Sequence, residues 1–403
     1  MAGIAAALAL ANNGSQVYLI EREPSIGGWA ASFCCKATDV CTKCSVCVVP
    51  PKLKQVAIHP RISILTDSTV AGLSGGIGNF KVELLQKPQY ISPERCIACG
   101  MCAEVCPTEP KAIRSPSPEA VPYSYVLDES RCLRLKGETC NLCQDVCPTN
   151  AIDFNLEPEK KELGVGAIIV ATGFEVFDAR EMGCLGYGRY PNVLTGLDLE
   201  RIFNRDGYLK LPSNGKDPKK VAFVQCIGSR DESHGYCSQV CCKYAIRFAR
   251  LIKYQNPNAE VTIFYIDLQT AGKGFAEFYE ECQKNIRFVR GLPVEVLGTS
   301  SGELEVRFEN ISEGTVKRET FDVVALSVGI SPKKDSWDLA RTLGINLGEC
   351  GFFDAKELLN SNETNVEGIF LAGTCQGPRD IPDSIAHGMA AAQSAMEVLE
   401  RCK

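Results

Sequence analysis

The sequence predicts an α/β fold with two dinucleotide-binding domains and a smaller α+β domain inserted into the first. Three observations support this prediction. A small, apolar, helix-like stretch at 2–13 leads into a short apolar strand that ends at the acidic Glu21, as in a dinucleotide-binding βαβ unit. A second strand-and-turn pattern begins at Lys220, and its next strand ends at Asp267. Between the two units, residues 96–147 carry regularly spaced cysteines.

Composition places the chain among ordinary globular proteins with room for two or three domains. It has 403 residues, of which 45% are hydrophobic and 23% charged. The net charge of -6, without a basic stripe, argues against binding to nucleic acid or to an anionic membrane surface. No apolar run reaches the roughly 18 residues of a membrane span. The 22 cysteines are the outlier, and because they fall in clumps we expect ligand sets in a cytoplasmic protein.

The insert at 91–155 begins with the bacterial ferredoxin spacing C-x2-C-x2-C-x3-C-P. In that pattern three close thiolates bind one cubane, and the fourth binds the other cluster. A second, looser run with a C-x7-C step follows and also ends in C-P. The expected ligands of the first [4Fe-4S] cluster are Cys96, Cys99, Cys102 and Cys147. Those of the second are Cys132, Cys140, Cys143 and Cys106.

Zinc and disulfides are the alternatives for these cysteines. Zinc competes for any C-x2-C pair, but two reciprocal C-P ends with small and apolar residues between the ligands favour iron and sulfur. A disulfide framework is disfavoured in a long chain without a signal peptide, since thiols stay reduced in the cytosol. We therefore predict that the insert transfers electrons.

The flanking segments predict a domain that binds FAD. Gly3 would be the last glycine of a G-x-G-x-x-G motif. The first strand and the two earlier glycines are absent from this sequence. Either the start is truncated, or the phosphate-binding turn is missing. A plain amphipathic helix followed by a strand is the alternative. Glu21 opens an E-x5-GG pattern, and later strands end in A-T-G and in A-G before a helix whose N-terminus could face an anionic flavin. The expected FAD contacts are Gly3, Glu21, Arg22, Gly27, Gly28, Trp29, Ala171, Thr172, Gly173, Gly373, Asp380 and Ile381.

A second cysteine clump at 34–47 repeats the C-x2-C-x2-C spacing. A further [4Fe-4S] cluster on Cys41, Cys44 and Cys47, with Cys34 or Cys35 as the fourth ligand, is one interpretation. Free or redox-active thiols near the flavin are the other.

The second dinucleotide unit lacks the glycines that a pyridine nucleotide requires. Its turn reads C-I-G-S-R-D-E, and a bulky turn keeps a pyrophosphate away from the backbone, so NAD binding is not expected. Cys237 and Cys241 stand four residues apart at the start of a predicted helix, where the dipole favours thiolate. Packed helix thiols are the alternative for Cys241 and its neighbour. Lys243 and Arg247 could add positive charge there, or be solvated.

The expected boundaries are 1–90, 156–219 and 336–403 for the FAD domain, 91–155 for the insert, and 220–335 for the degenerate second domain. The isolated cysteines and the three histidines carry no partner pattern. No Ser-His-Asp set, paired carboxylates or P-loop is recognised. Hydrolytic and phosphoryl chemistry therefore have no candidate residues.

The combined order of E-x5-GG, the insert, Q-C-I-G-S-R-D-E, Y-C-S-Q-V-C-C and Q-G-P-R-D-I-P-D resembles the A subunit of heterodisulfide reductase over nearly the whole chain. The resemblance implies a thioredoxin-reductase-like FAD protein that acts as an electron-transfer hub. In bifurcating members FAD takes two electrons and passes single electrons to a high-potential acceptor and to ferredoxin. It implies other subunits of a complex as partners, and a homodimer within a larger assembly. It also implies a further [4Fe-4S] cluster on Cys226, Cys237, Cys241 and Cys242.

The chain departs from longer members in ending at Lys403 without a C-terminal ferredoxin module, which makes separate iron–sulfur subunits more necessary. Bifurcation depends on the reduction potentials of the flavin semiquinone and of the clusters. The alternatives are a non-bifurcating relay subunit of a quinone-linked, benzoyl-CoA-reductase-type or methylene-tetrahydrofolate-reductase-type complex, an NAD(P)H:disulfide reductase, and a scaffold with degenerate sites.

Overall fold

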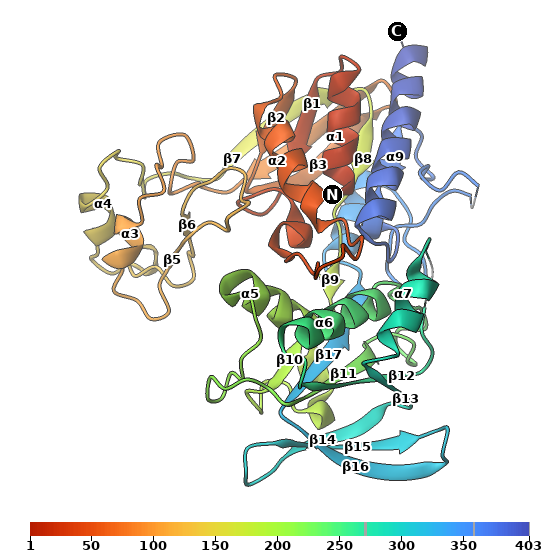
Figure 1. Ribbon diagram of the computed structural model, residues 1–403. Coiled ribbons are helices and arrows are strands. Elements are labelled where there is room, and N and C mark those ends of the chain that lie inside the picture. Colours follow the sequence, from red (N-terminus) through yellow and green to blue (C-terminus); the bar gives the residue numbers. More distant parts are fainter. Residues whose placement is uncertain (270–271, 358, 403) are drawn as a thin grey trace.

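The computed structural model describes residues 1–269, 272–357 and 359–402. Figure 1 shows three regions: the first domain with α1, α2 and α9, the second domain with β10 to β17, and an insert around α3 and α4 that projects to one side. Of the helices in these described ranges, none has the length and apolar character that crossing a membrane requires.

The first domain is built from the two ends of the chain. Helices α1 and α9 lie side by side, and Gly388 of α9 makes their close crossing possible, because a β-carbon there would lie 2.2 Å from the carbonyl oxygen of Ala2. The elements are α1 (Ala2–Asn12), β1 (Val17–Ile20), η1 (Gly28–Ser32), η2 (Val46–Val48), α2 (Val49–Ile58), β2 (Ile62–Leu65), β3 (Ser68–Gly76), β4 (Asn79–Gln86), β7 (Glu159–Val165), β8 (Ile168–Val170), α8 (Ser336–Leu343), β19 (Ile369–Leu371), η6 (Gly373–Cys375) and α9 (Ile381–Arg401).

The strands of this domain form two parallel pairs and one antiparallel sheet. Strand β1 pairs with β2, and β8 pairs with β19, while β3, β4 and β7 form the antiparallel sheet. Strands β3 and β4 are adjacent in this sheet and form a hairpin, which pairs Ser68 with Gln86 at one end and Gly76 with Asn79 at the other. Strands β1 and β8 do not pair with each other, and residues of both line the main cavity. The domain therefore presents the carboxyl ends of β1 and β8 to that cavity.

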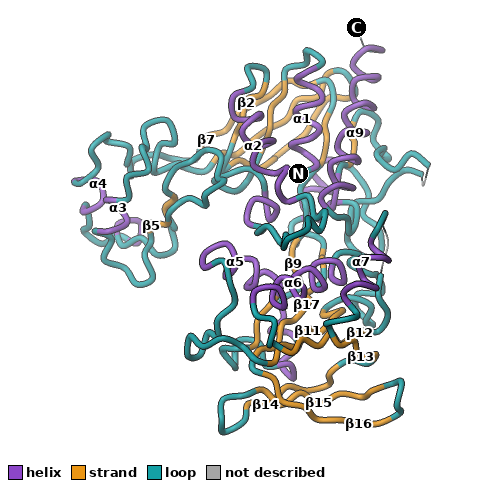
Figure 2. Tube along the Cα trace, viewed as in Figure 1, coloured by secondary structure: helices purple, strands orange, loops and turns teal. Residues whose placement is uncertain are grey.

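The insert leaves the first domain after β4 and returns at β7, so two covalent connections hold it. Most of it is irregular, as Figure 2 shows. Its regular elements are α3 (Met101–Glu104), β5 (Ile113–Arg114), β6 (Val126–Leu127), η3 (Arg134–Lys136) and α4 (Leu142–Asp145).

The second domain has a five-stranded parallel sheet in the order β10-β17-β11-β12-β13, with the antiparallel sheet β14-β15-β16 below it. Its elements are η4 (Ala179–Glu181), η5 (Gly183–Leu185), β10 (Val193–Thr195), α5 (Gly196–Asp206), β11 (Lys220–Ile227), α6 (Cys241–Gln255), β12 (Glu260–Tyr265), α7 (Phe275–Cys282), β13 (Arg287–Arg290), β14 (Pro293–Gly298), β15 (Leu304–Asn310), β16 (Thr315–Phe321) and β17 (Val323–Val328). The short strands β9 (Glu175–Val176) and β18 (Ile330–Ser331) pair where the two domains join.

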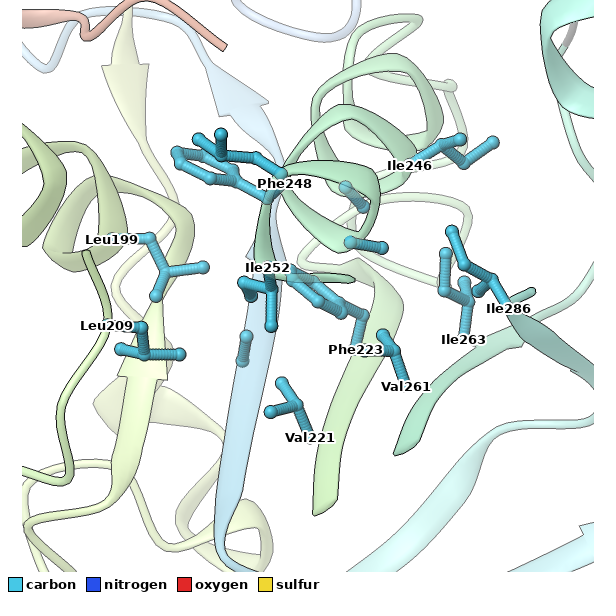
Figure 3. Packing of buried hydrophobic residues seen from close by; sticks show 14 of the residues in the cluster. Leu199, Leu209, Val221, Phe223, Ile246, Phe248, Ile252, Val261, Ile263 and Ile286 are labelled. Carbon is cyan, nitrogen blue, oxygen red and sulfur yellow. The ribbon is translucent and has the colours of Figure 1, made fainter. Parts of the chain in front are cut away.

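The core of the second domain explains its layers. Strand β11 is buried on both faces: Val221 and Phe223 pack under α6, and Ala222 and Val224 pack toward β14 to β16. Figure 3 shows Phe223 and Val221 below Phe248 and Ile252 of α6. Such two-sided burial is typical of a central parallel strand.

One boundary differs from the expected one. Residues 193–206 form β10 and α5 and lie in the second domain, although the sequence assigned 156–219 to the FAD domain. The reason is that β10 adds to the edge of the second sheet, pairing with β17 through Leu194 and Ala325. A three-residue strand whose partner lies so far along the chain leaves little local signal.

Candidate functional site

The main cavity, of about 1650 Å³, lies where the two domains meet. It is lined by the start of α1, the ends of β1 and β8, η1 and the start of α9. Eleven of the twelve expected FAD contacts line it, and Gly373 does not. A β-carbon at Gly373 would lie 2.5 Å from Ala2 Cβ, so this glycine permits helix packing instead of facing the cavity.

Glycines at the cavity wall leave room for a nucleotide beside the backbone. A β-carbon at Gly3 would lie 3.1 Å from Ala171 Cβ, so α1 and the end of β8 are packed closely. Gly28 and Gly173 have φ of +55° and +78°, and no atom lies within 4 Å of the position a β-carbon would occupy. Positive φ and open space at both positions allow a ligand to approach the main chain. The residues present therefore fit a dinucleotide cofactor.

Glu21 supplies the acid at the end of β1. Its backbone nitrogen donates to Leu65 O at 2.9 Å, and its carboxylate accepts from Glu23 N at 3.0 Å. Burial raises the pKa of Glu21, and the bond from Glu23 N opposes this rise. A carboxylate at this position can accept hydrogen bonds from ribose hydroxyls.

The N-terminus of α9 meets α6 across the cavity. Asp380 caps α9 by accepting from Asp383 N at 3.1 Å, and Lys243 of α6 donates to Asp380 Oδ2 at 3.0 Å. Burial would raise the pKa of Asp380, but the bonds from Asp383 N and Lys243 outweigh burial, so this pKa is lowered. Arg379, also on the wall, donates to Gly373 O at 3.0 Å. The free amides of a helix start and two cations thus surround one part of the cavity.

The first expected cluster set of the insert surrounds one small cavity. That cavity, of about 20 Å³, is lined by all four of its cysteines, Cys96, Cys99, Cys102 and Cys147. Burial and, to a lesser extent, the neighbouring thiols of Cys96 and Cys99 together raise the pKa of Cys102 to about 11. The fold therefore brings the three close cysteines and the distant one together.

The second set is assembled in the same way. Burial and, to a lesser extent, the nearby thiols of Cys132 and Cys140 together raise the pKa of Cys143 to about 11. Cys106 and Cys132 lie in one buried cluster with Ala112. Within the described ranges, no three His, Cys, Asp or Glu side chains are close enough to hold a single metal ion.

The third set lies at the start of α6. Burial raises the pKa of Cys241, and the thiols of Cys242, Cys226 and Cys237 act in the same direction, so the four lie close together. The helix begins at Cys241, one turn later than the sequence predicts, because Gln239 has a φ of +59° and Cys237 lies in the preceding loop.

The turn that would hold NAD is filled by the chain itself. A β-carbon at Gly228 would lie 2.0 Å from the ring of Phe177, so this ring covers the glycine of the turn. The strand acid Asp267 forms an ion pair with Arg230. The glycine of the turn and the acid of the strand are therefore both engaged in internal contacts.

Arg247 belongs to the loop at 34–47 and not to the cysteines of α6. Its Nε donates to Thr42 O at 3.1 Å. Burial lowers the pKa of Arg247, and the thiols of Cys44 and Cys41 oppose this effect from nearby. The side chain of Arg247, which the sequence suggested could add positive charge beside the cysteines of α6, thus reaches the other cysteine clump.

The loop itself is pinned by a buried ion pair. Lys36 pairs with Glu200 of α5, and Cys34 N donates to Glu200 Oε2 at 2.8 Å. Cys34 is buried, whereas Cys35, Cys41 and Cys47 are exposed, and Cys44 lines the main cavity. Neither Lys36 nor Glu200 could be recognised from sequence, because each is an ordinary charged residue until the fold buries it.

Comparisons with known proteins agree with this architecture. Residues 95–151 match the 4Fe-4S dicluster domain family. Thioredoxin reductases of T. acidophilum and Lactococcus lactis share the fold, with TM-scores of 0.54 and 0.53, 15% and 16% identity, and coverage of 98% and 99% of this chain and 94% and 96% of theirs. Fold and insert thus define a thioredoxin-reductase-like protein with an inserted 4Fe-4S dicluster domain, as the sequence predicts.

Two curated relatives are more similar. The chain is 42% identical to the A subunit of the H(2):CoB-CoM heterodisulfide,ferredoxin reductase of Methanothermobacter marburgensis, over 98% of this chain and 62% of the relative. It is 43% identical to an iron–sulfur A subunit of the CoB--CoM heterodisulfide reductase of Methanopyrus kandleri, over 99% and 63%. The chain is a homologue of the heterodisulfide reductase A subunits, and the expected resemblance is confirmed. This chain spans about three fifths of the length of these relatives.

Proposed function

We propose that the chain is an electron-transfer hub that binds one FAD in the main cavity and relays its electrons through [4Fe-4S] clusters. The main observation that supports this proposal is that three separate cysteine-bearing segments border the cavity. Cys44 lines it from the loop at 34–47, Lys243 and Tyr244 line it from the start of α6, and Val126 lines it from the insert. A flavin in this cavity would therefore lie close to a proposed set of cluster ligands in each of these three segments.

The residues have distinct roles in this proposal. Gly28 and Gly173 would let the cofactor lie against the backbone, and Glu21 would accept from its ribose. The start of α9, with Lys243 and Arg379, would stabilise negative charge on the reduced ring. FAD, when bound, exchanges two electrons with a donor and single electrons with the clusters. The clusters are those assigned to the two insert sets and to Cys226, Cys237, Cys241 and Cys242, with a further one at Cys35, Cys41, Cys44 and Cys47.

We infer the partners of this chain from the names of its relatives. Those names specify heterodisulfide reductases and, in several cases, ferredoxin. We propose that this chain works with other subunits that deliver electrons and reduce the terminal acceptor, in a reducing compartment such as the cytoplasm. In its more specific form, this proposal is that the chain splits electron pairs and that ferredoxin is one of the two acceptors. The relatives differ in their named donors.

The test is an anaerobic reductive titration of the chain reconstituted with FAD, iron and sulfide. The proposal predicts uptake of about five electrons per chain, two by the flavin and one by each of three clusters, or about six with the cluster at 35–47. Uptake of about two electrons, by flavin alone, would contradict the relay. A chain that binds neither FAD nor iron would support the scaffold alternative.

A further inference from the structure

Tyr125 is the aromatic side chain at the small cavity that the first cysteine set surrounds. It lines that cavity together with Cys96, Cys99 and Cys102. A β-carbon at Gly100 would lie 3.0 Å from Tyr125 Oη, and Gly100 has a φ of +87°, so glycine allows the ring to lie over the loop between two ligands. The ring thus covers one side of the site.

Tyr125 also directly precedes β6, one of the two short paired strands that lie between this site and the main cavity. Strands β5 and β6 pair Arg114 with Val126, and successive residues of an extended strand point to opposite faces. Arg114, Ser124 and Val126 line the main cavity. On the other face, Ile113 and Tyr125 pack into the core of the insert with its cysteines. One two-stranded layer therefore has the flavin cavity on one side and this cysteine set on the other.

The layer is tied to the flavin domain beside the paired glycines. Ile26 N donates to Val121 O at 2.9 Å, four residues before Tyr125. Ser124 is buried, and Tyr125 is half-buried. The segment that carries Tyr125 is thus fixed between the two redox sites.

We propose that Tyr125 is a positioning residue that keeps water away from the cluster of Cys96, Cys99, Cys102 and Cys147 and thereby lowers its reduction potential. The inference rests on the proposed function. One electron from the flavin adds one negative charge to a cluster that four thiolates already make anionic, and no bond forms or breaks. Water stabilises that added charge, so shielding by the ring makes the reduced state less favourable.

The experiment is a redox titration followed by EPR on the full chain with FAD and clusters. In Tyr125→Ala, we expect the ratio of reduced to oxidised cluster at a fixed potential to rise at least about tenfold, which is about 59 mV for one electron. The affected signal should be the one that Cys99→Ser removes, and the other insert cluster should not shift. Tyr125→Phe should titrate like the unchanged chain, because the ring remains.

A matched control lies two residues earlier. Tyr123 is 55% exposed and does not line the small cavity, so Tyr123→Ala should leave both potentials unchanged. An unchanged potential in Tyr125→Ala at full iron content would overturn the inference, and so would an equal shift in Tyr125→Phe. If the alanine variant loses iron, Tyr125→Leu replaces it in the test. In the leucine variant we expect the reduction potential to rise by a smaller amount, and an unchanged potential would overturn the inference. Absence of cluster signals from the unchanged chain would instead refute the proposed function.

Discussion

Lys243 Nζ lies 3.0 Å from Asp380 Oδ2 and joins the helix that begins with Cys241 to the helix whose N-terminus lines the flavin cavity. The two side chains are 13% and 27% exposed, so water screens the pair only in part. This contact between the two domains holds the helix that begins with Cys241 beside the proposed flavin site.

The contact predicts measurable coupling. In a double-mutant cycle with Lys243→Gln and Asp380→Asn, we expect a coupling energy of about 1–2 kcal/mol in urea unfolding of the reduced, cofactor-free chain. The folded-state pKa of Asp380 is lowered, so its contribution is complete above the ordinary Asp pKa and is lost as pH falls through the lowered value. Additive single effects at neutral pH would show that the pair does not couple the helices.

The buried pair of Lys36 and Glu200 predicts a larger effect. Their side chains are 4% and 8% exposed, and removing one partner of a buried pair leaves an uncompensated charge. We expect Lys36→Met to lower the free energy of unfolding by about 3–5 kcal/mol, and a second change, Glu200→Leu, to restore part of it. The measurement is urea unfolding followed by circular dichroism under reducing conditions.

An exposed ion pair provides the control for this variant. Arg341 and Asp338 are 84% and 79% exposed, so Arg341→Met should leave the unfolding curve unchanged. Equal losses in Lys36→Met and Arg341→Met would mean that the burial of Lys36 contributes nothing.

Glu21 predicts a pH dependence of flavin binding. Burial raises the pKa of this carboxyl, although the bond from Glu23 N opposes the rise. Its ionised form, which accepts from the ribose, is therefore lost at a higher pH than for an exposed glutamate. We expect FAD affinity to weaken as pH falls through this raised pKa, and Glu21→Gln to bind more weakly at neutral pH with a flatter profile. Fluorescence titration of FAD measures both, and identical profiles for the two chains would contradict the role of Glu21.

Much of the site could be predicted because its signals are local. The spacing of Cys96, Cys99 and Cys102 is set by one loop and one short helix, and the glycines that face the cavity follow strand ends. The fold class likewise follows from two strand-to-acid patterns and an insert with its own cysteine spacing, and the similarity in fold to thioredoxin reductases confirms it.

The contacts that sequence reasoning missed are those between distant segments. Arg247 lies one turn after Lys243 on the same helix, yet it reaches Thr42 because the loop at 34–47 crosses to the second domain. Phe177 covers Gly228 across the junction of the domains. Tyr125 lies between the two cysteine motifs of the insert and belongs to no motif itself. Contacts between residues far apart in the sequence depend on tertiary packing. The local pattern around either residue does not identify its partner.

The most direct test of the hub is quantitation of iron, sulfide and flavin in the anaerobically prepared chain and in a variant carrying Cys241→Ser and Cys242→Ser. Cys282→Ser is the control, because Cys282 is buried and belongs to none of the expected ligand sets, so the iron content of this variant should not change. The account predicts one FAD and about twelve irons per chain, or about sixteen with the cluster at 35–47, falling by about four in the variant. About eight irons, unchanged by the replacement, would contradict it, because the cysteines of α6 would then be structural and the flavin would lack that relay.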